Sequence, residues 1–295
     1  MIYTVTCNPA IDHIVSLPTF AAGGLNRAAC EAFRFGGKGV NVSLVLKELG
    51  VPSVALGFVA GFTGDALQAG LNAQGLATDF IRVDGETRVN TKISAETETE
   101  LNGVGPTVTN ADVAALCDRV KTLSAGDTLV LSGSLAPGMT ADDAAHLCAA
   151  AGDGVRVVVD IAGEPLKAAL AARPFLIKPN EAELRDLCGE GDCLSLAKKA
   201  QAMGARNVLC SRGAAGALLL TESGEAVACE APQGEVKSTV GAGDSLLAGF
   251  LAALGQGKSP AAALSYGVMV GSATAFSVGL ATKADIDAVT GGNAV

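Results

Sequence analysis

The clearest chemical signal in the sequence is an acid that follows a run of small residues. Gly241, Ala242 and Gly243 stand immediately before Asp244, and an apolar, helix-like stretch covers 246–254. Small residues at a helix start let consecutive backbone N–H groups point at one place, where the helix dipole also favours negative charge. Asp244 should remain ionised at neutral pH and could accept the proton of a hydroxyl that attacks a bound phosphoryl group. A glycine-rich loop with an aspartate that merely caps the helix would give the same pattern.

A second glycine-rich loop carries a lysine and an asparagine. The run Gly36-Gly37-Lys38-Gly39-Val40-Asn41 leads into a helix-like stretch at 42–49. Its glycines let a polar ligand approach the backbone closely, and Lys38 and Asn41 would face the same place from the first helical turn. The loop suits a sugar or a sugar phosphate. A turn with a solvated lysine is the alternative.

Two other places in the first hundred residues could bind a polar ligand. Asp12 follows the first strand-like stretch and its Asn-Pro turn, at the expected carboxyl edge of the sheet, where ligands bind in open α/β folds. Its carboxylate could hold two sugar hydroxyls, or the turn could simply end the strand. Arg88, Asn90 and Lys92 alternate, so on an extended ribbon they share one face, which could grip a phosphate or only meet solvent.

Nucleotide and metal candidates follow two later strand-like runs. Lys178 ends one run, and Asn180 and Glu183 stand three residues apart at a helix start, where they could hold hydrated Mg²⁺ through water or only cap the helix. The stretch 211–216 could admit a nucleotide against bare backbone or form a hairpin turn. Neither GxxxxGK[ST] nor a helix-opening GxGxxG occurs, so the two familiar nucleotide loops lack support.

The elements that must position these residues alternate along the chain from about residue 110. Helix-like stretches alternate with short β-branched runs, which predicts an α/β fold with a mainly parallel sheet. The runs are apolar without a polar alternation, as expected for strands covered on both faces. The helical stretches are 111–123, 141–151, 181–188 and 196–203, and the strands are 129–131, 155–159, 175–178 and 208–210.

One segment has a different pattern. Side-chain character alternates with period two over 87–101, which predicts an antiparallel ribbon with one wet face. The irregular stretch 12–35 could pair with it as a small sheet. We therefore expect a single domain over 1–295 with a β-strand lid formed by segments at about 13–35 and 87–105.

Composition excludes several classes of partner and site. The 21 basic and 30 acidic residues give a net charge of −9, so neither nucleic acid nor a membrane is an expected partner. An anionic ligand must then be held by a local cluster of cations and N–H donors. With 49% hydrophobic residues the chain can bury a large core. Eight cysteines without a CxxC pair and two histidines are poor material for a zinc site.

The chain start and the apolar runs predict a location. Residues 1–7 are strand-like and lack the basic start and apolar block of a signal peptide, so we expect a cytoplasmic protein whose cysteines stay reduced. Apolar runs such as 268–281 are interrupted by Gly, Ser and Thr. No membrane-spanning segment is therefore predicted.

In their order along the chain, these motifs resemble the PfkB/ribokinase carbohydrate kinases over nearly the whole sequence. An NPAxD near the N-terminus and an arginine on the ribbon are similar to the sugar-phosphate branch, with 1-phosphofructokinases and tagatose-6-phosphate kinases as the nearest likenesses. The GGKGxN loop is shared with ribokinases and does not discriminate. Ala136 interrupts the usual SGSLPxG, and Ile161 follows Asp160 where Ser or Thr is common. The matching segments are TCNPAID, GGKGVN, TRVN, SGSLAPG, KPNEAE, SRGAAG and STVGAGDS.

The resemblance implies a fold and a role for each matching residue. The fold would be a ribokinase-like three-layer α/β/α sandwich with a mainly parallel central sheet and a small β-strand lid. Asp244 would be the catalytic base, with Gly241, Ala242 and Gly243 as the anion hole. Substrate-contacting positions would be Asp12, Gly37, Lys38, Asn41, Arg88 and Ser132. The nucleotide positions would be Lys178, Asn180, Ser211, Gly213, Gly216 and Thr239, with Asn180 and Glu183 also at the Mg²⁺ site.

The resemblance also implies an activity. We expect ATP- and Mg²⁺-dependent phosphorylation of a ketohexose monophosphate, most simply fructose 1-phosphate to fructose 1,6-bisphosphate. A cationic pocket formed by Lys38 and Arg88 would disfavour free sugars, because leaving it without a phosphate is costly. Tagatose 6-phosphate phosphorylation and a non-catalytic sugar-phosphate-binding protein remain as alternatives. A homodimer formed through the lid is a further expectation.

Overall fold

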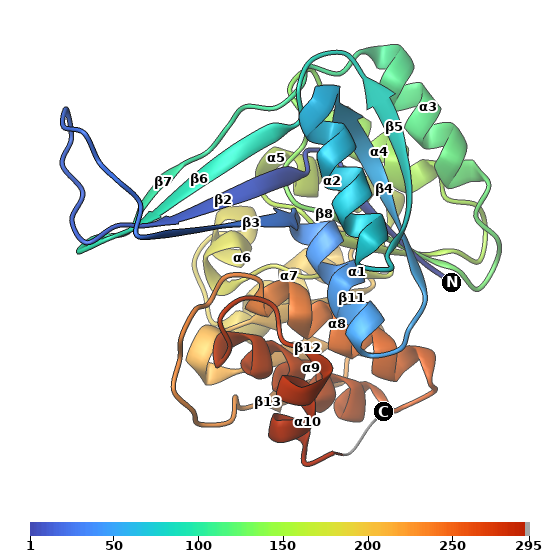
Figure 1. Cartoon of the computed structure of the whole chain (residues 1–295). Coiled ribbons are helices and arrows are strands. Elements are labelled where there is room, and N and C mark those ends of the chain that lie inside the picture. Colours follow the sequence, from blue (N-terminus) through green and yellow to red (C-terminus); the bar gives the residue numbers. More distant parts are fainter. Residues whose placement is uncertain (293–295) are drawn as a thin grey trace.

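A nine-stranded sheet forms the centre of the computed structural model, which describes residues 1–292 (Figure 1). The spatial order is β13-β12-β11-β10-β9-β8-β1-β4-β5. All pairings from β11 to β5 are parallel, and only β11–β12 and β12–β13 are antiparallel, which confirms the mainly parallel sheet. The strands are β1 (Ile2–Thr6), β4 (Ser53–Ala60), β5 (Ala77–Val83), β8 (Thr128–Ser132), β9 (Arg156–Asp160), β10 (Leu176–Ile177), β11 (Asn207–Ser211), β12 (Ala217–Leu220) and β13 (Ala226–Cys229).

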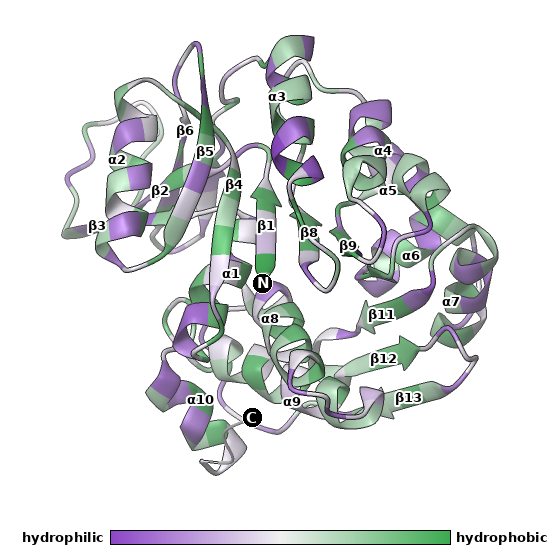
Figure 2. Cartoon of the chain, turned by 90° about the vertical axis from the view of Figure 1, so that its right-hand side faces the viewer, coloured by the Kyte–Doolittle hydropathy of each residue, from purple (hydrophilic) through white to green (hydrophobic). Residues whose placement is uncertain are grey.

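Helices cover both faces of this sheet (Figure 2). Alternate residues of a strand enter different cores: Leu129 and Leu131 pack on one face, while Val130 packs on the other. The first face carries α3 (Asn110–Lys121), α4 (Ala141–Ala150), α5 (Gly163–Ala169), α6 (Glu181–Cys188) and α7 (Cys193–Ala202). The second carries α1 (Lys38–Glu48), α8 (Ala242–Gly255), α9 (Pro260–Ala275) and α10 (Lys283–Thr290), with α2 (Gly61–Ala73) beside β4 and β5. This burial on both faces explains why the strand runs are continuously apolar.

Side-chain caps set several helix starts. Thr109 and Asp112 form a capping box that starts α3, and Thr140 with Asp143 starts α4 in the same way. Asp192 caps α7 by accepting from the Ser195 N–H, so this helix begins at Cys193 rather than at the expected residue 196. The expected strand at 175–178 is shorter in the structure, where only Leu176–Ile177 pair with neighbours.

A separate four-stranded sheet projects from the carboxyl edge of the main sheet and is called the lid below (Figure 1). Its order is β3-β2-β6-β7, with β2 (Ala10–Ser16), β3 (Cys30–Gly36), β6 (Arg88–Ser94) and β7 (Thr99–Leu101). The β2–β3 and β6–β7 pairs are antiparallel, but β2 and β6 run parallel. They do so because each follows a strand of the parallel main sheet, β1 or β5, and leaves it at the same edge.

The position of Asp12 differs from the sequence-based expectation. The turn at Asn8-Pro9 ends β1 as expected, but a new strand begins at Ala10. Asp12 therefore lies inside the lid, opposite Arg34 on β3 and Asn90 on β6, and not at the edge of the main sheet. The pattern of an acid after a turn does not reveal which sheet the next strand joins.

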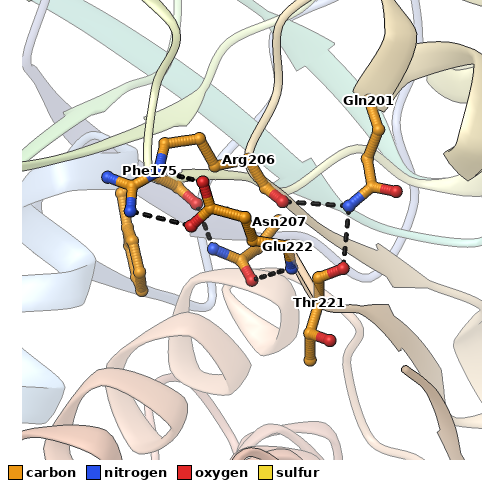
Figure 3. A network of polar contacts seen from close by, with 6 residues as sticks. All are labelled: Phe175, Gln201, Arg206, Asn207, Thr221 and Glu222. Atoms are coloured by element: carbon orange, nitrogen blue, oxygen red, sulfur yellow. Dashed lines mark hydrogen bonds and ion pairs between the residues drawn. The ribbon is translucent and has the colours of Figure 1, made fainter. Parts of the chain in front are cut away.

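A polar network stabilises the far edge of the main sheet, where parallel pairing changes to antiparallel (Figure 3). Arg206 donates through Nε and Nη2 to the two carboxylate oxygens of Glu222, at 2.9 and 2.8 Å. The Glu222 N–H donates to Asn207 Oδ1 at 2.8 Å, and Gln201 Nε2 donates to the carbonyls of Arg206 and Thr221. These bonds connect α7, β11 and the end of β12.

In residues 1–292, no helix is long and apolar enough to span a bilayer.

Candidate active site

A cleft of about 510 Å³ lies between the lid and the carboxyl ends of the main strands. The main sheet, the lid, α1 and the start of α8 all contribute to its walls. Five of the residues expected to contact a substrate line one side of it: Asp12, Gly37, Lys38, Asn41 and Arg88. On its other side it is lined by Lys178, Asn180, Glu183, Ser211, Gly241, Gly243 and Asp244. Segments more than two hundred residues apart in sequence thus meet at one edge of the sheet, as the strand order requires.

Five expected site residues do not line this cleft. Ser132 is buried at the end of β8, and its neighbours Gly133 and Ser134 line the cleft instead. Thr239 is exposed, and Ala242 is the first residue of α8. Gly213 and Gly216 form the turn between β11 and β12, which corresponds to the hairpin alternative.

Gly216 has a structural requirement of its own. Its φ is +82°, and a Cβ there would lie 1.9 Å from the Cys229 carbonyl oxygen on the neighbouring strand. The close approach of β13 therefore explains this glycine without a nucleotide.

Asp244 lies in the cleft at the third position of α8 and is only 6% exposed. Asn41 Nδ2 donates to its Oδ2 at 2.8 Å, which orients the carboxylate. Burial raises the pKa of Asp244 to about 6, and the nearby charge of Asp160 acts in the same direction; Lys178, Asn41 and Lys38 oppose the shift. A carboxylate with this pKa is still mostly ionised at pH 7 but is a better proton acceptor than an ordinary aspartate.

One of the three N–H groups expected to form the anion hole at the start of α8 already has an acceptor. Gly241 caps the helix with φ +81°, and a Cβ there would lie 2.6 Å from Leu280 Cδ2. The Ala242 N–H already donates to the Thr239 carbonyl at 3.2 Å. The N–H groups of Gly243 and Asp244 belong to the first helical turn, where the helix itself offers no acceptor. Both can face an anion in the cleft, which Gly241, Gly243 and Asp244 line.

Two lysines reach the cleft beside Asp244. Lys178 is buried, and its Nζ lies 3.2 Å from Asp160 Oδ1; Lys38 Nζ lies 3.6 Å from the same oxygen. Burial alone would lower the pKa of Lys178, but the carboxylates of Asp160 and Asp244 together raise it above its usual value. Lys178 is therefore a permanently charged group in a poorly hydrated place. Asp160 was not among the site residues expected from the sequence, although it could have been found there as the acid that ends an apolar strand.

The lysine loop is shaped by close packing on β1. Gly37 has φ +123°, and a Cβ there would lie 2.6 Å from Thr6 Cγ2. The Thr6 hydroxyl accepts from the Val40 N–H at 3.0 Å, which fixes the start of α1. Lys38 and Asn41 therefore face the cleft from the first turn, as their spacing predicts.

The lid supplies an alternating set of polar groups. Arg88, Asn90 and Lys92 all line the cleft, as their period-two spacing predicts. Arg88 Nε donates to the Asn8 carbonyl at 3.1 Å, and Asn90 Nδ2 donates to Asp12 Oδ1 at 2.9 Å. Burial lowers the pKa of Arg88, and the Asp12 charge partly opposes this. The alternation in the sequence pointed to Asn90 and Lys92 together with Arg88, but the family resemblance implied a role for Arg88 alone.

Asn180 and Glu183 cap α6 and also line the cleft. The Asn180 N–H donates to Glu183 Oε2 at 2.8 Å, and the Glu183 N–H donates to Asn180 Oδ1 at 2.9 Å. The helix-cap alternative thus describes their contacts, while Glu183 keeps Oε1 outside this box. Among residues 1–292 there is no cluster of three His, Cys, Asp or Glu side chains that could hold a metal ion. Mg²⁺ needs no such cluster when phosphates and water complete its shell.

A second cleft of about 520 Å³ adjoins the first. It runs below the lid toward the segment after α9, and it shares Asp12, Asn41 and Gly241 with the first cleft.

The comparisons with known proteins decide the family. The model of the pfkB family carbohydrate kinases matches residues 6–287. The chain belongs to this family. It is 42% identical over 289 residues to a 1-phosphofructokinase of Bacillus subtilis, covering 96% of this chain and 95% of that protein. It is 35% identical over 294 residues to a D-tagatose-1-phosphate kinase of Bacillus licheniformis, covering 97% and 96%.

Solved structures of the pfkB family and of a ribokinase have the same fold. Phosphofructokinase-2 from Escherichia coli in complex with fructose-6-phosphate superposes with a TM-score of 0.91 at 28% identity, covering 98% of each chain. A ribokinase from Thermotoga maritima superposes with a TM-score of 0.77 at 21% identity, covering 99% of each chain, a likeness that concerns the fold alone. The expected ribokinase-like α/β fold and family resemblance are confirmed.

The burial of Asp244 predicts how the stability of the protein depends on pH. Because burial raises its pKa from 3.8 to about 6, the native state binds this proton more tightly than the unfolded state does. The protonated acid therefore contributes stability that is complete below pH 3.8 and is lost as the pH rises through about 6. Asp244→Asn should increase the free energy of unfolding by about 2–3 kcal/mol near pH 7.5, because the amide carries no charge.

Thermal unfolding followed by circular dichroism at two pH values measures this effect. The melting temperature of Asp244→Asn should exceed that of the wild type by several degrees at about pH 7.5, and the gap should narrow at about pH 5. Asp118→Asn, on the exposed side of α3, is the matched control and should show no gap. A variant that melts below the wild type at about pH 7.5 would contradict the electrostatic account.

Proposed function

We propose that the chain transfers the γ-phosphoryl group of ATP to a hydroxyl of a ketohexose monophosphate, converting fructose 1-phosphate to fructose 1,6-bisphosphate. The observation that carries this proposal is a buried carboxylate with a pKa raised to about 6, Asp244, in the same cleft as Lys38 and Arg88. The relatives named 1-phosphofructokinase support the same acceptor.

In the proposed mechanism Asp244 takes the proton of the acceptor hydroxyl. Asn41 holds the carboxylate from one side, so that its other oxygen, Oδ1, faces the hydroxyl. As the hydroxyl attacks phosphorus, the N–H groups at the start of α8 and the ammonium group of Lys178 stabilise the charge of the transferred group. Positioning and electrostatics thus carry most of the catalysis. The lid would exclude water that competes for the phosphoryl group.

The acceptor would lie between the lid and the lysine loop. Arg88 donates only through Nε to the Asn8 carbonyl. Both terminal amino groups therefore remain for a bidentate contact to the phosphate of the sugar. Lys38 would add a second positive charge. Asp12 accepts one bond from Asn90 and keeps Oδ2 for sugar hydroxyls.

ATP would lie against Lys178, Asn180 and Ser211, on the other side of Asp244. Glu183 would be the acid that holds Mg²⁺, because its Oε1 remains outside the capping box and Glu183 lines the cleft. Contact through water, shared with Asn180, suits a metal that keeps much of its hydration shell. Bound Mg²⁺ would neutralise charge on the ATP phosphates. Gly213, Gly216 and Thr239 stay predicted nucleotide contacts outside this cleft.

An ATP-consumption assay with a panel of acceptors tests the proposal. Fructose 1-phosphate should give the highest kcat/KM, against tagatose 1-phosphate, tagatose 6-phosphate, fructose 6-phosphate, free fructose and ribose. The tagatose phosphates are included because they demand nearly the same binding groups. Equal efficiency on the free sugars would refute the phosphate pocket. No turnover of any acceptor would favour a non-catalytic sugar-phosphate-binding protein.

Removing the proposed base should abolish most of the turnover. Asp244→Ala should lower kcat by about 10²–10⁴-fold, the usual scale for loss of a general base, while the affinity for ATP changes little. In the wild type, kcat/KM should fall as the pH drops through about 6, where Asp244 becomes protonated. Steady-state kinetics and ATP binding by calorimetry measure both effects. Turnover like that of the wild type in Asp244→Ala would exclude the assignment.

Arg88 should contribute to the binding of one substrate only, the sugar phosphate. Arg88→Ala should raise the KM for fructose 1-phosphate by about 10²-fold, because it removes a charged bidentate contact, and should leave the KM for ATP within about twofold. Arg82→Ala, which removes an arginine paired with Asp65 outside the cleft, is the control and should change neither constant. An equal rise of both KM values would show that Arg88 does not mark the acceptor site.

A homodimer through the lid is part of the proposal. Large apolar side chains lie exposed on the lid and its flanks, among them Phe33, Leu101 and Val104, at 59%, 60% and 76% exposure. Exposed apolar side chains on and beside one small sheet support an interaction surface there. Sedimentation velocity should therefore give a dimer for the wild type and a monomer for Phe33→Glu. A monomeric wild type at micromolar concentration would rule the dimer out.

A further inference from the structure

Asp160 lies below the floor of the cleft, where it contacts both lysines without lining the cleft itself. It is the last residue of β9 and is 1% exposed. Its Oδ1 is shared by Lys178 Nζ at 3.2 Å and Lys38 Nζ at 3.6 Å. Its Oδ2 is buried and has no hydrogen-bond partner within residues 1–292. In the described structure the two ammonium groups are thus the partners that compensate this carboxylate.

The backbone of Asp160 is held in place by the central sheet. Its strand pairs with β8 on one side and β10 on the other, and its carbonyl accepts from the Gly133 N–H at 3.0 Å. A carboxylate held by two strands of a central sheet cannot move to follow a long side chain. The lysines must therefore take positions set by the carboxylate.

The two lysines depend on Asp160 for different reasons. The side chain of Lys178 is 6% exposed, and a buried ammonium group without a close anion is strongly destabilising. The side chain of Lys38 is 42% exposed and would otherwise sample many rotamers in solvent. Asp160 Oδ1 thus pairs with the buried ammonium group of Lys178 and restrains the more exposed ammonium group of Lys38.

We propose that Asp160 is the positioning residue of this kinase, holding Lys38 at the sugar-phosphate end and Lys178 at the ATP end of the cleft while it contacts neither substrate. The inference rests on the proposed function. It goes beyond that function by connecting both substrate-binding lysines to a single buried charge. Errors of about 1 Å in such groups can cost about 10²-fold in rate.

Double-mutant cycles on kcat/KM test the proposal. Asp160→Asn, which keeps the shape of the side chain, should lower kcat/KM by about 10²-fold and raise the KM for both ATP and the sugar phosphate. In a Lys38→Met or a Lys178→Met background the same replacement should cost less than about tenfold, because one of its two targets is gone. The proposal would be overturned if, in both backgrounds, the loss of kcat/KM in the double variant equalled the product of the losses in the two single variants to within about twofold. Asp160 and the lysines would then act independently.

A structural role alone gives a different result. A variant that only lost folded protein would have a lower kcat and unchanged KM values for both substrates, and that outcome also overturns the proposal. Asp160→Asn with Lys178→Met removes both members of the buried pair, so it should melt at a higher temperature than either single variant. Asp127→Asn removes an acid at the opposite end of β8, where it pairs with the N-terminus, and should change neither KM.

A second variant covers the case in which Asp160→Asn does not fold. Asp160→Glu keeps the charge that the lysines need but moves it by one methylene group. It should melt closer to the wild type and still lower kcat/KM by about tenfold or more. Unchanged kinetics in this variant would overturn the positioning role. Absence of sugar-phosphate kinase activity in the wild type would instead refute the proposed function.

Discussion

The structure of this site depends on the cost of burying charge at the carboxyl edge of a parallel sheet. Asp160 and Asp244 lie within one poorly hydrated region, and the charge of Asp160 raises the energy of the charged form of Asp244. Lys178 lies near both carboxylates, and Lys38, whose side chain is partly exposed, adds a second positive charge. Two acids can be kept together there only because two lysines compensate them. The same balance leaves Asp244 a stronger base than an exposed aspartate.

The lid has its place because of strand direction. β1 and β5 belong to the parallel sheet and end at the same edge, so the strands that follow them, β2 and β6, leave in the same direction and pair parallel. This pairing sets Ala10 opposite Arg88 and Asp12 opposite Asn90. The acid and the arginine of the proposed sugar site therefore come from segments far apart in sequence but adjacent in register. Two short connections, between β1 and β2 and between β5 and β6, thus bring that half of the site together.

Several residues serve the fold and the site with the same atoms. Asn180 and Glu183 exchange the two hydrogen bonds of a capping box, and both line the cleft. Thr6 starts α1 by accepting from the Val40 N–H, and it also packs where only a glycine fits at position 37. A capping or packing explanation and a functional one are thus compatible at these positions. A helix that starts at this edge of the sheet places its capping residues beside the cleft.

The sequence by itself determined the α/β class, the strand and helix order between residues 110 and 210 except for α5, and the loop that carries Asp244, because these depend on local periodicity and on glycine spacing. It also indicated that Arg88, Asn90 and Lys92 share a face, because alternation is a property of any extended strand. Only the tertiary structure decided that Asp12 belongs to the lid, that Gly213 and Gly216 form a hairpin turn, and that Asp160 holds two lysines. Register between distant strands and the sharing of one buried charge depend on contacts across the whole chain, and no local pattern encodes them.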